Sequence, residues 1–363
     1  MDSPTPPACR LVDRGDIPAA PAARRTADDP THLGVRVSDD EFDHRPVMAK
    51  EIVKTFASVP PGYVLDATLG GGGHASLLLE AHPHLRILGL DRDRDALAAA
   101  RETLTVYGDR VATEHLRFDQ LETAMDKLSL DHLSGALFDL GVSSPQLDRP
   151  ERGFSYRNPA PLDMRMDQTE QWTAADIVNG YDVGRLARVL RQFGDERFAS
   201  RIARAIVAAR PIETTTQLSE IVVGAIPAPA RRTGGHPAKR TFQALRIELN
   251  QELAVLPSAL ATAIDRTEVG GRLAVLSYHS GEDRIVKEQI RLAETGGCSC
   301  PPELPCVCEA VQIVRVVRGI PRTPSDAEKA SNPRARSARL RVAERSSPTR
   351  RSQSQTRRPR GER

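Results

Sequence analysis

The sequence lacks the features that mark membrane, fibrous and disulfide-stabilised proteins. No apolar run approaches the roughly 18 to 20 residues that a membrane-spanning helix requires, and the N-terminal residues have neither the basic nor the apolar region of a secretory signal. Five cysteines in 363 residues are too few for a disulfide scaffold. The composition excludes collagen and a coiled coil, and no fixed-period repeat supports a solenoid. We therefore expect a cytoplasmic globular protein of one large or two moderate domains.

The charge of the chain is unevenly distributed. The formal net charge is only +3, but residues 331–363 contain eleven arginines against two glutamates, a local charge of +9. Such a tail suits RNA binding through counterion release. The alternative is that it only keeps the chain soluble. Residues 1–42 and 346–363 show no apolar periodicity, and we predict that both segments are disordered.

Strand-like and helical segments alternate in the first half of the chain. Apolar runs at 63–67, 87–91 and 136–139 read as buried strands, and 75–80 and 94–104 read as helices. Strands separated by helices indicate a parallel sheet that binds ligands at the carboxyl ends of its strands. The predicted fold class is α/β, with a doubly wound sheet.

A long helical segment interrupts this alternation after Gly141. Helical periodicity occurs at 183–190, 198–209 and 242–256, and strand patterns return at 272–278, 311–317 and 338–343. We predict a discontinuous sheet domain formed by residues 43–141 and 257–345, and an inserted, mainly helical domain over residues 142–256.

A glycine-rich loop follows the first predicted strand. Gly70, Gly72 and Ala75 fit the pattern G-x-G-x-x-A, in which glycine lets backbone amides approach a bound ligand. Asp91 ends the next strand, where a carboxylate can accept hydrogen bonds from both ribose hydroxyls of an adenosine. Alternatively, the loop is only a tight turn and Asp91 caps a helix. Nicotinamide dinucleotides and S-adenosylmethionine both suit this geometry.

The end of the third predicted strand favours S-adenosylmethionine. Asp139 is followed by Ser143 and Ser144, a potential group of hydrogen-bond acceptors. The exocyclic amine of a base is a poor nucleophile, and acceptors that hold its N–H groups favour pyramidal nitrogen and aim it at a sulfonium methyl. We assign Asp139, Ser143 and Ser144 to catalysis, although Ser-Ser-Pro-Gln is also an ordinary turn sequence.

Long motifs in this chain resemble those of one family, the bacterial 16S rRNA cytosine-N4 methyltransferases of the MraW (RsmH) type. The resemblance extends from about Phe42 to Arg345 and rests on segments 66–74, 139–148, 150–155, 161–167, 196–199, 236–244, 270–273 and 332–337. It implies a class I S-adenosylmethionine-dependent methyltransferase fold with a helical insertion. It also implies methylation of N4 of a cytosine in the decoding centre of 16S rRNA, on the assembled small ribosomal subunit.

The resemblance further implies roles for individual residues. Those implied to contact the cofactor are Gly72, Gly73, His74, Asp91, Phe118, Asp139 and Gln146. Phe118 would stack beside the adenine, unless it is a core aromatic residue. The insertion would receive the flipped cytosine, and the RNA-contact candidates are Arg152, Phe154, Arg165, Lys239 and Arg240.

Two positions depart from the common family pattern, which has Phe and Leu where this chain has Tyr278 and Gly281. We expect the Tyr278 exchange to be mild and Gly281 to loosen the turn.

The reaction needs no strong general base, because the amine loses its proton during or after methyl transfer, to Asp139 or to water. We therefore expect Asp139 to act first by orienting the amine. Two rival interpretations remain: amino-group methylation of another nucleic acid such as DNA, and a ribosome-assembly factor without activity. A dehydrogenase is disfavoured because no second domain with a hydride-transfer histidine is recognisable. The sequence does not show whether the protein is a monomer or a homodimer.

Four cysteines cluster near the C-terminal end of the predicted sheet domain. Cys298, Cys300, Cys306 and Cys308 form the pattern C-x-C-x5-C-x-C. Four soft ligands in so short a loop suit a tetrahedral structural zinc ion. Reduced free thiols and redox chemistry are the alternatives. Because many members of the family lack this cluster, we do not expect it to be catalytic.

Overall fold

The computed structural model describes residues 46–143, 146, 148–232, 235–301 and 307–350. These residues belong to one compact unit. The predicted disordered arm, residues 1–42, lies outside the described residues, as does the chain after Arg350.

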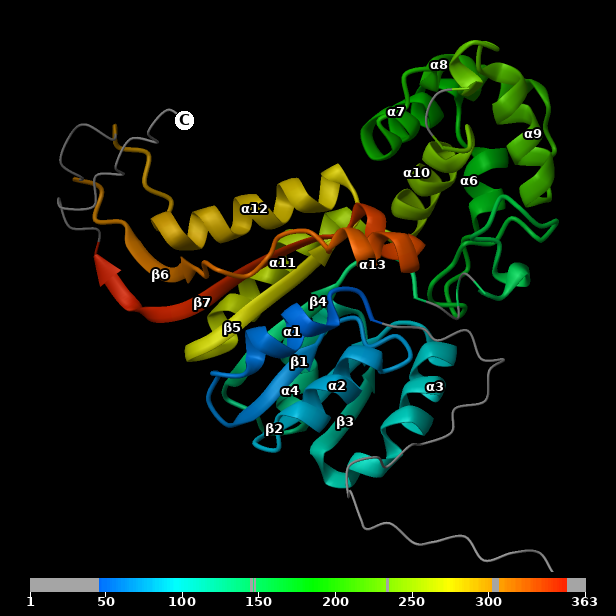
Figure 1. Cartoon of the computed structure of the whole chain (residues 1–363). Coiled ribbons are helices and arrows are strands. Elements are labelled where there is room, and N and C mark those ends of the chain that lie inside the picture. Colours follow the sequence, from blue (N-terminus) through cyan, green and yellow to red (C-terminus); the bar gives the residue numbers. More distant parts are fainter. Residues whose placement is uncertain (1–45, 144–145, 147, 233–234, 302–306, 351–363) are drawn as a thin grey trace, which may run out of the picture. The chain divides into compact units, whose positions relative to one another are not determined.

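A seven-stranded sheet forms the centre of the sheet domain, in the order β3-β2-β1-β4-β5-β7-β6 (Figure 1). The first five strands are parallel, and β7 runs antiparallel to both β5 and β6. The strands are β1 Gly62–Asp66, β2 Leu85–Asp91, β3 Val111–His115, β4 Leu133–Asp139, β5 Thr267–Ser277, β6 Val311–Val316 and β7 Arg339–Arg350. The doubly wound α/β architecture predicted from the sequence is therefore present.

Helices connect these strands and build the insertion. Those of the sheet domain are α1 Ala49–Phe56, α2 Gly73–Ala81, α3 Arg94–Leu104, α4 Leu121–Lys127, α11 Glu252–Arg266, α12 Ser280–Thr295 and α13 Asp326–Ser331. Those of the insertion are α6 Ala174–Gly180, α7 Val183–Gly194, α8 Ala199–Ala208, α9 Thr215–Ala225 and α10 Lys239–Asn250. Within the described ranges, no helix is long and apolar enough to cross a membrane.

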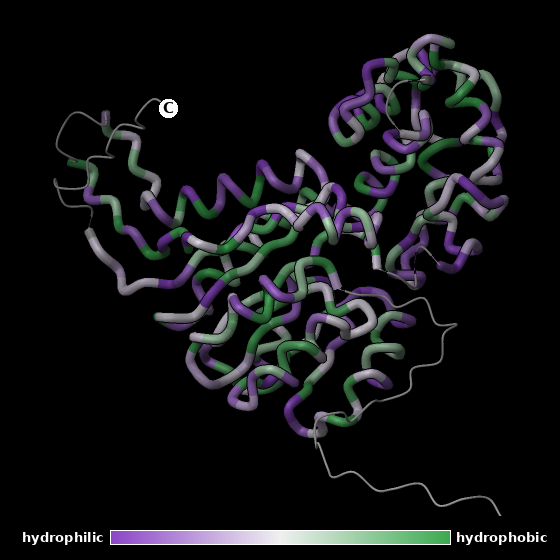
Figure 2. Tube along the Cα trace, in the orientation of Figure 1, coloured by the Kyte–Doolittle hydropathy of each residue, from purple (hydrophilic) through white to green (hydrophobic). Residues whose placement is uncertain are grey.

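The two faces of the sheet are covered by different helices. Successive strand residues point to opposite faces, so Val64 packs into one hydrophobic cluster and Leu65 into the other. The first cluster includes residues of α1, α2 and α3, and the second includes residues of α4, α11 and α12. Figure 2 shows that the strands are largely apolar, as expected for a sheet buried on both faces.

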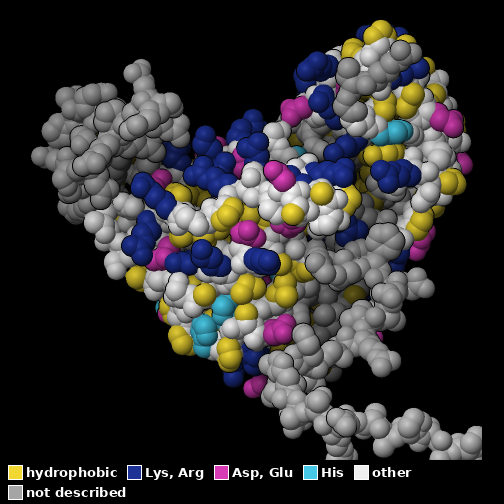
Figure 3. Space-filling model, viewed as in Figure 1, with side chains coloured by type: hydrophobic (Ala, Val, Ile, Leu, Met, Phe, Trp, Pro, Cys, Tyr) yellow, Lys and Arg dark blue, Asp and Glu magenta, His cyan; other side chains and the backbone are white. Residues whose placement is uncertain are grey.

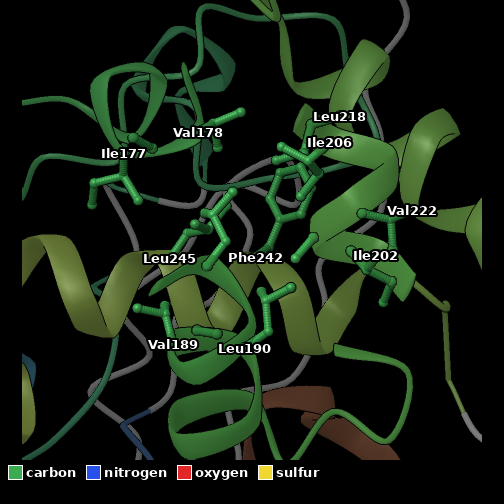
Figure 4. Packing of buried hydrophobic residues seen from close by; sticks show 14 of the residues in the cluster. Ile177, Val178, Val189, Leu190, Ile202, Ile206, Leu218, Val222, Phe242 and Leu245 are labelled. Atoms are coloured by element: carbon green, nitrogen blue, oxygen red, sulfur yellow. The ribbon is translucent and has the colours of Figure 1, made fainter. Parts of the chain in front are cut away.

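The insertion has a hydrophobic core of its own. Side chains of its helices point toward one another around Phe242 and Leu245 of α10 (Figure 4). Ile177, Leu190, Ile202, Ile206 and Leu218 are among the buried members of this cluster, each at most 1% exposed. A separate core is what an inserted domain requires.

Two sequence predictions need correction, and one strand was not identified from the sequence. Strand β3 was not predicted, because its sequence Val-Ala-Thr-Glu-His has no apolar run and every residue is only half-buried. The helix predicted over 242–256 is two helices, which break at Gln251 with φ of 53°. The last strand continues to Arg350, so Thr349 and Arg350 of the predicted disordered tail pair with Gln312 and Val311 at the start of β6.

Candidate active site

Three aspartates lie at the carboxyl ends of adjacent parallel strands. Asp66, Asp91 and Asp139 end β1, β2 and β4, and β1 lies between the other two strands. The carboxyl ends of parallel strands meet at one edge of the sheet, where ligands bind in doubly wound folds. The three acids predicted from the sequence therefore share one edge.

The glycine loop is held in place by Asp91. One carboxylate oxygen of Asp91 accepts from the amide of Gly70 at 2.8 Å, and the other accepts from the amide of Asp93 at 2.9 Å. Gly70 has φ of 53°, in the left-handed region that favours glycine. A Cβ added to Gly71 would meet nothing within 4 Å. The loop therefore faces open space at Gly71.

Gly72 and Gly73, which the family resemblance implied as cofactor contacts, are packed against protein. A Cβ on Gly72 would lie 3.1 Å from Leu104, and one on Gly73 would lie 2.8 Å from Pro46. The amide of Gly72 already donates to the carbonyl of Leu69. The first amides of α2, which begins at Gly73, have no partner within the helix and can bind a ligand.

The pKa values of two of the acids are raised. Burial raises the pKa of Asp66 to about 7, and the neighbouring carboxylates of Asp139 and Asp91 add to the rise. Burial likewise raises the pKa of Asp91 to about 6, although the amides of Asp93 and Gly70 oppose it. Desolvation disfavours the charged carboxylate, so both acids titrate near neutral pH.

Three groups fix Asp139. The Tyr278 hydroxyl donates to one carboxylate oxygen at 2.6 Å, and the Nδ1 atom of His74 lies 3.4 Å from the other. The backbone amide of Asp139 donates to the Thr68 hydroxyl at 2.7 Å. The Asp139 side chain is still 26% exposed, so a substrate can reach a carboxylate whose direction is already set.

His74 is buried between two acceptors. Its Nε2 atom lies 2.9 Å from the carbonyl of Val47, and its Nδ1 atom faces Asp139. A neutral imidazole can donate from only one nitrogen, whereas an imidazolium donates to both. Burial by itself lowers the pKa of His74, but the hydrogen bond and charge of Asp139 outweigh it and raise the pKa above its usual value.

Ser143 lies beside the glycine loop, and its amide donates to the Gln146 side-chain oxygen at 3.1 Å. Its Oγ atom is buried and has no hydrogen-bond partner among the described residues, and its Cβ lies 3.7 Å from a Cβ built on Gly70. A buried hydroxyl without a partner is costly, so this atom is available to a ligand. Ser144 lies outside the described residues.

Gln146 and Phe118 have protein partners. The Gln146 amide group donates to Asp93 at 3.0 Å, so this side chain links Ser143 to the loop after β2. Phe118 is half-buried and packs edge-on against Phe138, with ring centroids 5.8 Å apart. Contact of Gln146 and Phe118 with a cofactor stays a prediction.

Arg152 and Phe154, two of the predicted RNA contacts, are buried. The Arg152 guanidinium donates to Asp93 at 2.9 Å, and both side chains are only 2% exposed. It also donates to the carbonyls of Arg165 and Met166. Phe154 is 9% exposed and belongs to the core of the insertion. Arg152 therefore anchors the insertion to the loop after β2, and contact of Arg152 and Phe154 with RNA stays a prediction that their burial disfavours.

The other three RNA-contact candidates keep some exposure. Arg165 is 21% exposed and donates twice to Asp163, each time at 2.8 Å. Arg240 is exposed and donates to the carbonyl of Asp195. Lys239 is exposed and lines a pocket of about 510 Å³. The pocket residues are Tyr156, Arg157, Gly235, His236, Lys239, Pro333, Arg336 and Ser337.

Sequence reasoning did not identify the contact between Tyr278 and Asp139. The exchange of Phe for Tyr was judged mild, but the added hydroxyl contacts Asp139 directly. Gly281 does not loosen the turn, because it lies in the first turn of α12, which a capping box of His279 and Glu282 closes. The departure of Tyr278 from the family pattern was visible in the sequence. Its contact with Asp139 could be identified only from the structure.

The parallel sheet with an antiparallel seventh strand, the glycine loop after β1 and the acids at the strand ends define the class I S-adenosylmethionine-dependent methyltransferase fold. Residues 41–346 match the MraW methylase family. This chain belongs to that family.

Three curated relatives, each called ribosomal RNA small subunit methyltransferase H, are similar to this chain over most of its length. The protein of Thermobifida fusca is 49% identical over 91% of this chain and 98% of its own length. That of Salinispora tropica is 54% identical, covering 82% of this chain and 80% of its own. That of Saccharopolyspora erythraea is 52% identical, covering 83% and 93%.

Proposed function

We propose that this protein transfers a methyl group from S-adenosylmethionine to N4 of a cytosine in the decoding centre of 16S rRNA, on the small ribosomal subunit in the cytoplasm. The observation that carries the proposal is the Asp139 carboxylate, which Tyr278 and His74 hold at a partly exposed strand end. The names of the curated relatives support rRNA of the small subunit as the substrate.

The site fits S-adenosylmethionine. Asp91 would accept from the ribose hydroxyls, and the open space beside Gly71 would admit the ligand. The Ser143 hydroxyl, which has no partner among the described residues, would bond to it. When bound, the cofactor supplies an electrophilic methyl group on a sulfonium.

Asp139 would accept one N–H of the cytosine amine and so direct the nitrogen lone pair toward the methyl group. As the N–C bond forms and the S–C bond breaks, the amine nitrogen becomes positive and must lose a proton. The partly exposed Asp139 carboxylate can take that proton or pass it to water. Tyr278 stays a donor throughout, because burial and the Asp139 charge raise its pKa well above the usual value. Tyr278 and His74 therefore keep Asp139 in one orientation.

The pocket beside Lys239 suits an RNA backbone. Its described lining contains three cationic side chains, Arg157, Lys239 and Arg336, and none that is acidic. Tyr156 stacks on His236 with ring centroids 4.3 Å apart, which gives the pocket an aromatic wall. Cationic side chains hold phosphates and aromatic rings stack on unpaired bases. We assign this pocket to nucleotides that flank the target base.

A second basic surface lies on α12. Arg284, Lys287 and Arg291 are exposed and spaced for one side of the helix. Figure 3 shows Lys and Arg side chains gathered over this part of the molecule. We assign this surface to sequence-independent phosphate contacts.

The experiment is transfer of labelled methyl to small ribosomal subunits that lack the modification, followed by nucleoside analysis of the digested RNA. We expect N4-methylcytidine with the intact protein and with subunits as substrate. Methylation of DNA but not of subunits would favour the rival nucleic-acid substrate. Cofactor binding without any transfer would favour an inactive assembly factor.

A further inference from the structure

The cysteine cluster lies outside the site described above and is not explained by it. The Sγ atoms of Cys298, Cys300 and Cys308 all lie within 4.8 Å of one another, and no disulfide joins any two of these three described cysteines. Cys298 and Cys300 are half-buried and Cys308 is exposed. Free cysteine usually packs as a small apolar residue in the interior, so three converging thiols near the surface need another explanation. Cys306 lies outside the described residues.

The cysteines lie on a connection whose two ends are in close contact. Helix α12 ends at Thr295, and Gly296 follows with φ of 60° and donates its amide to the carbonyl of Leu292. A Cβ on Gly296 would lie 2.4 Å from the backbone of Val311, the first residue of β6. Only glycine permits this close approach. The end of α12 and the start of β6 are therefore pressed together, and the cysteines lie on the connection between them.

The distances suit metal ligation better than a disulfide. A tetrahedral zinc ion with Zn–S bonds of about 2.3 Å keeps its thiolates about 3.8 Å apart, so sulfurs within 4.8 Å need only a small adjustment. A disulfide requires an S–S distance of about 2.05 Å and can join only two of the three thiols.

We propose that Cys298, Cys300 and Cys308 bind a structural zinc ion that joins the end of α12 to the start of β6. Thiolates prefer zinc to the hard cations calcium and magnesium. The site is separate from methyl transfer, because α12 has 16 residues and so spans about 24 Å between its two ends. Its first turn adjoins Tyr278, whereas the cysteines follow its last. The ion would stabilise β6, an edge strand of the sheet.

The test is elemental analysis of the full-length protein, purified under reducing conditions without chelator, beside Cys300→Ser. Cys9→Ser is the matched control, because it also removes one thiol but lies far from the cluster in the sequence. We expect about one zinc per chain in the wild type and in Cys9→Ser, and a loss of most of the zinc in Cys300→Ser.

A second measurement avoids dependence on the folding of Cys300→Ser. Wild-type protein stripped with a chelator is titrated with CoCl₂ and then ZnCl₂, and we expect an intense sulfur-to-cobalt absorption that zinc abolishes. Restoring zinc should raise the thermal midpoint while leaving S-adenosylhomocysteine affinity within about twofold. The proposal would be overturned if the wild-type protein contained well below one metal per chain. This holds both if its thiols titrate as free and if its mass shows a disulfide. So would cobalt binding without the thiolate absorption.

Discussion

At the residue scale, the site depends on how side chains from distant parts of the chain fix one carboxylate. Asp139 was predicted from the sequence because an acid at the end of a buried strand has a recognisable pattern. Its partner Tyr278 lies 139 residues further along the chain, and no local pattern reports such a contact. The same limit applies to Arg152, since a lone arginine carries no sign in the sequence that it will be buried against Asp93.

Tyr278→Phe tests the orientation of Asp139. The variant keeps the ring and removes only the hydroxyl that donates to the carboxylate. A hydrogen bond to a charged group is worth about 1.5 kcal/mol or more, so we expect kcat to fall about tenfold while S-adenosylhomocysteine affinity is unchanged. Tyr63→Phe, on β1, is the matched control and should retain wild-type kcat. An unchanged kcat in Tyr278→Phe would show that this hydroxyl is dispensable.

The raised pKa of Asp91 predicts a pH dependence of cofactor binding. An ionised carboxylate accepts from both ribose hydroxyls, whereas a protonated one must donate from one of its oxygens. Since the pKa of Asp91 in the free protein is about 6, the ionised fraction rises between pH 5 and pH 7. We expect S-adenosylhomocysteine affinity, measured by calorimetry, to increase roughly tenfold over this interval.

Asp91→Asn supplies the control for that experiment. Its affinity should be lower and nearly constant between pH 5 and pH 7. A wild-type affinity that does not rise with pH would contradict the assignment of Asp91 to the ribose.

At the element scale, strands with a continuous apolar run were predicted well and elements defined by tertiary contacts were not. Strand β3 has only half-buried residues, so its sequence lacks the pattern of a central strand. The break between α10 and α11 depends on Gln251 with φ of 53°. Gln251 carries none of the glycine or proline signals that mark a helix end. The apolar spacing continues across the break, which is why the sequence predicted a single helix.

Arg152→Ala tests how the insertion is anchored to the sheet domain. Removing one partner of a buried ion pair leaves an uncompensated charge on Asp93, which costs about 3–5 kcal/mol. We expect the free energy of unfolding, from denaturant titration, to fall by that amount. Arg149→Ala is the control, because its ion pair with Asp95 is between half-exposed side chains. The anchoring role would be wrong if both variants lost the same small amount of stability.

At the scale of the whole molecule, the surface that we propose to face RNA is defined by the distribution of exposed cations. The sequence suggested the arginine-rich tail as an RNA-binding segment, but part of that tail forms strand β7. The exposed cations of α12 are not evident in the sequence, because the exposed Glu288 lies between Lys287 and Arg291. Only the helix brings Arg284, Lys287 and Arg291 to one side.

The double variant Lys287→Ala/Arg291→Ala tests this surface. Each lost phosphate contact should reduce the slope of log affinity against log salt by about 0.7 to 0.9, so we expect a fall of about 1.4 to 1.8 in binding to small subunits. Lys54→Ala/Arg86→Ala removes two exposed charges near the opposite, amino-terminal edge of the parallel strands. Equal slopes in the two double variants would remove α12 from the interface.

The central claim is that Asp139 orients the target amine, and Asp139→Asn tests it most directly. Asparagine has nearly the same shape but carries no charge and presents only one acceptor oxygen. Single-turnover methyl transfer to small subunits should slow by about 100-fold or more, while S-adenosylhomocysteine affinity changes by less than about threefold. Equal losses in rate and affinity, or a rate close to that of the wild type, would contradict the account.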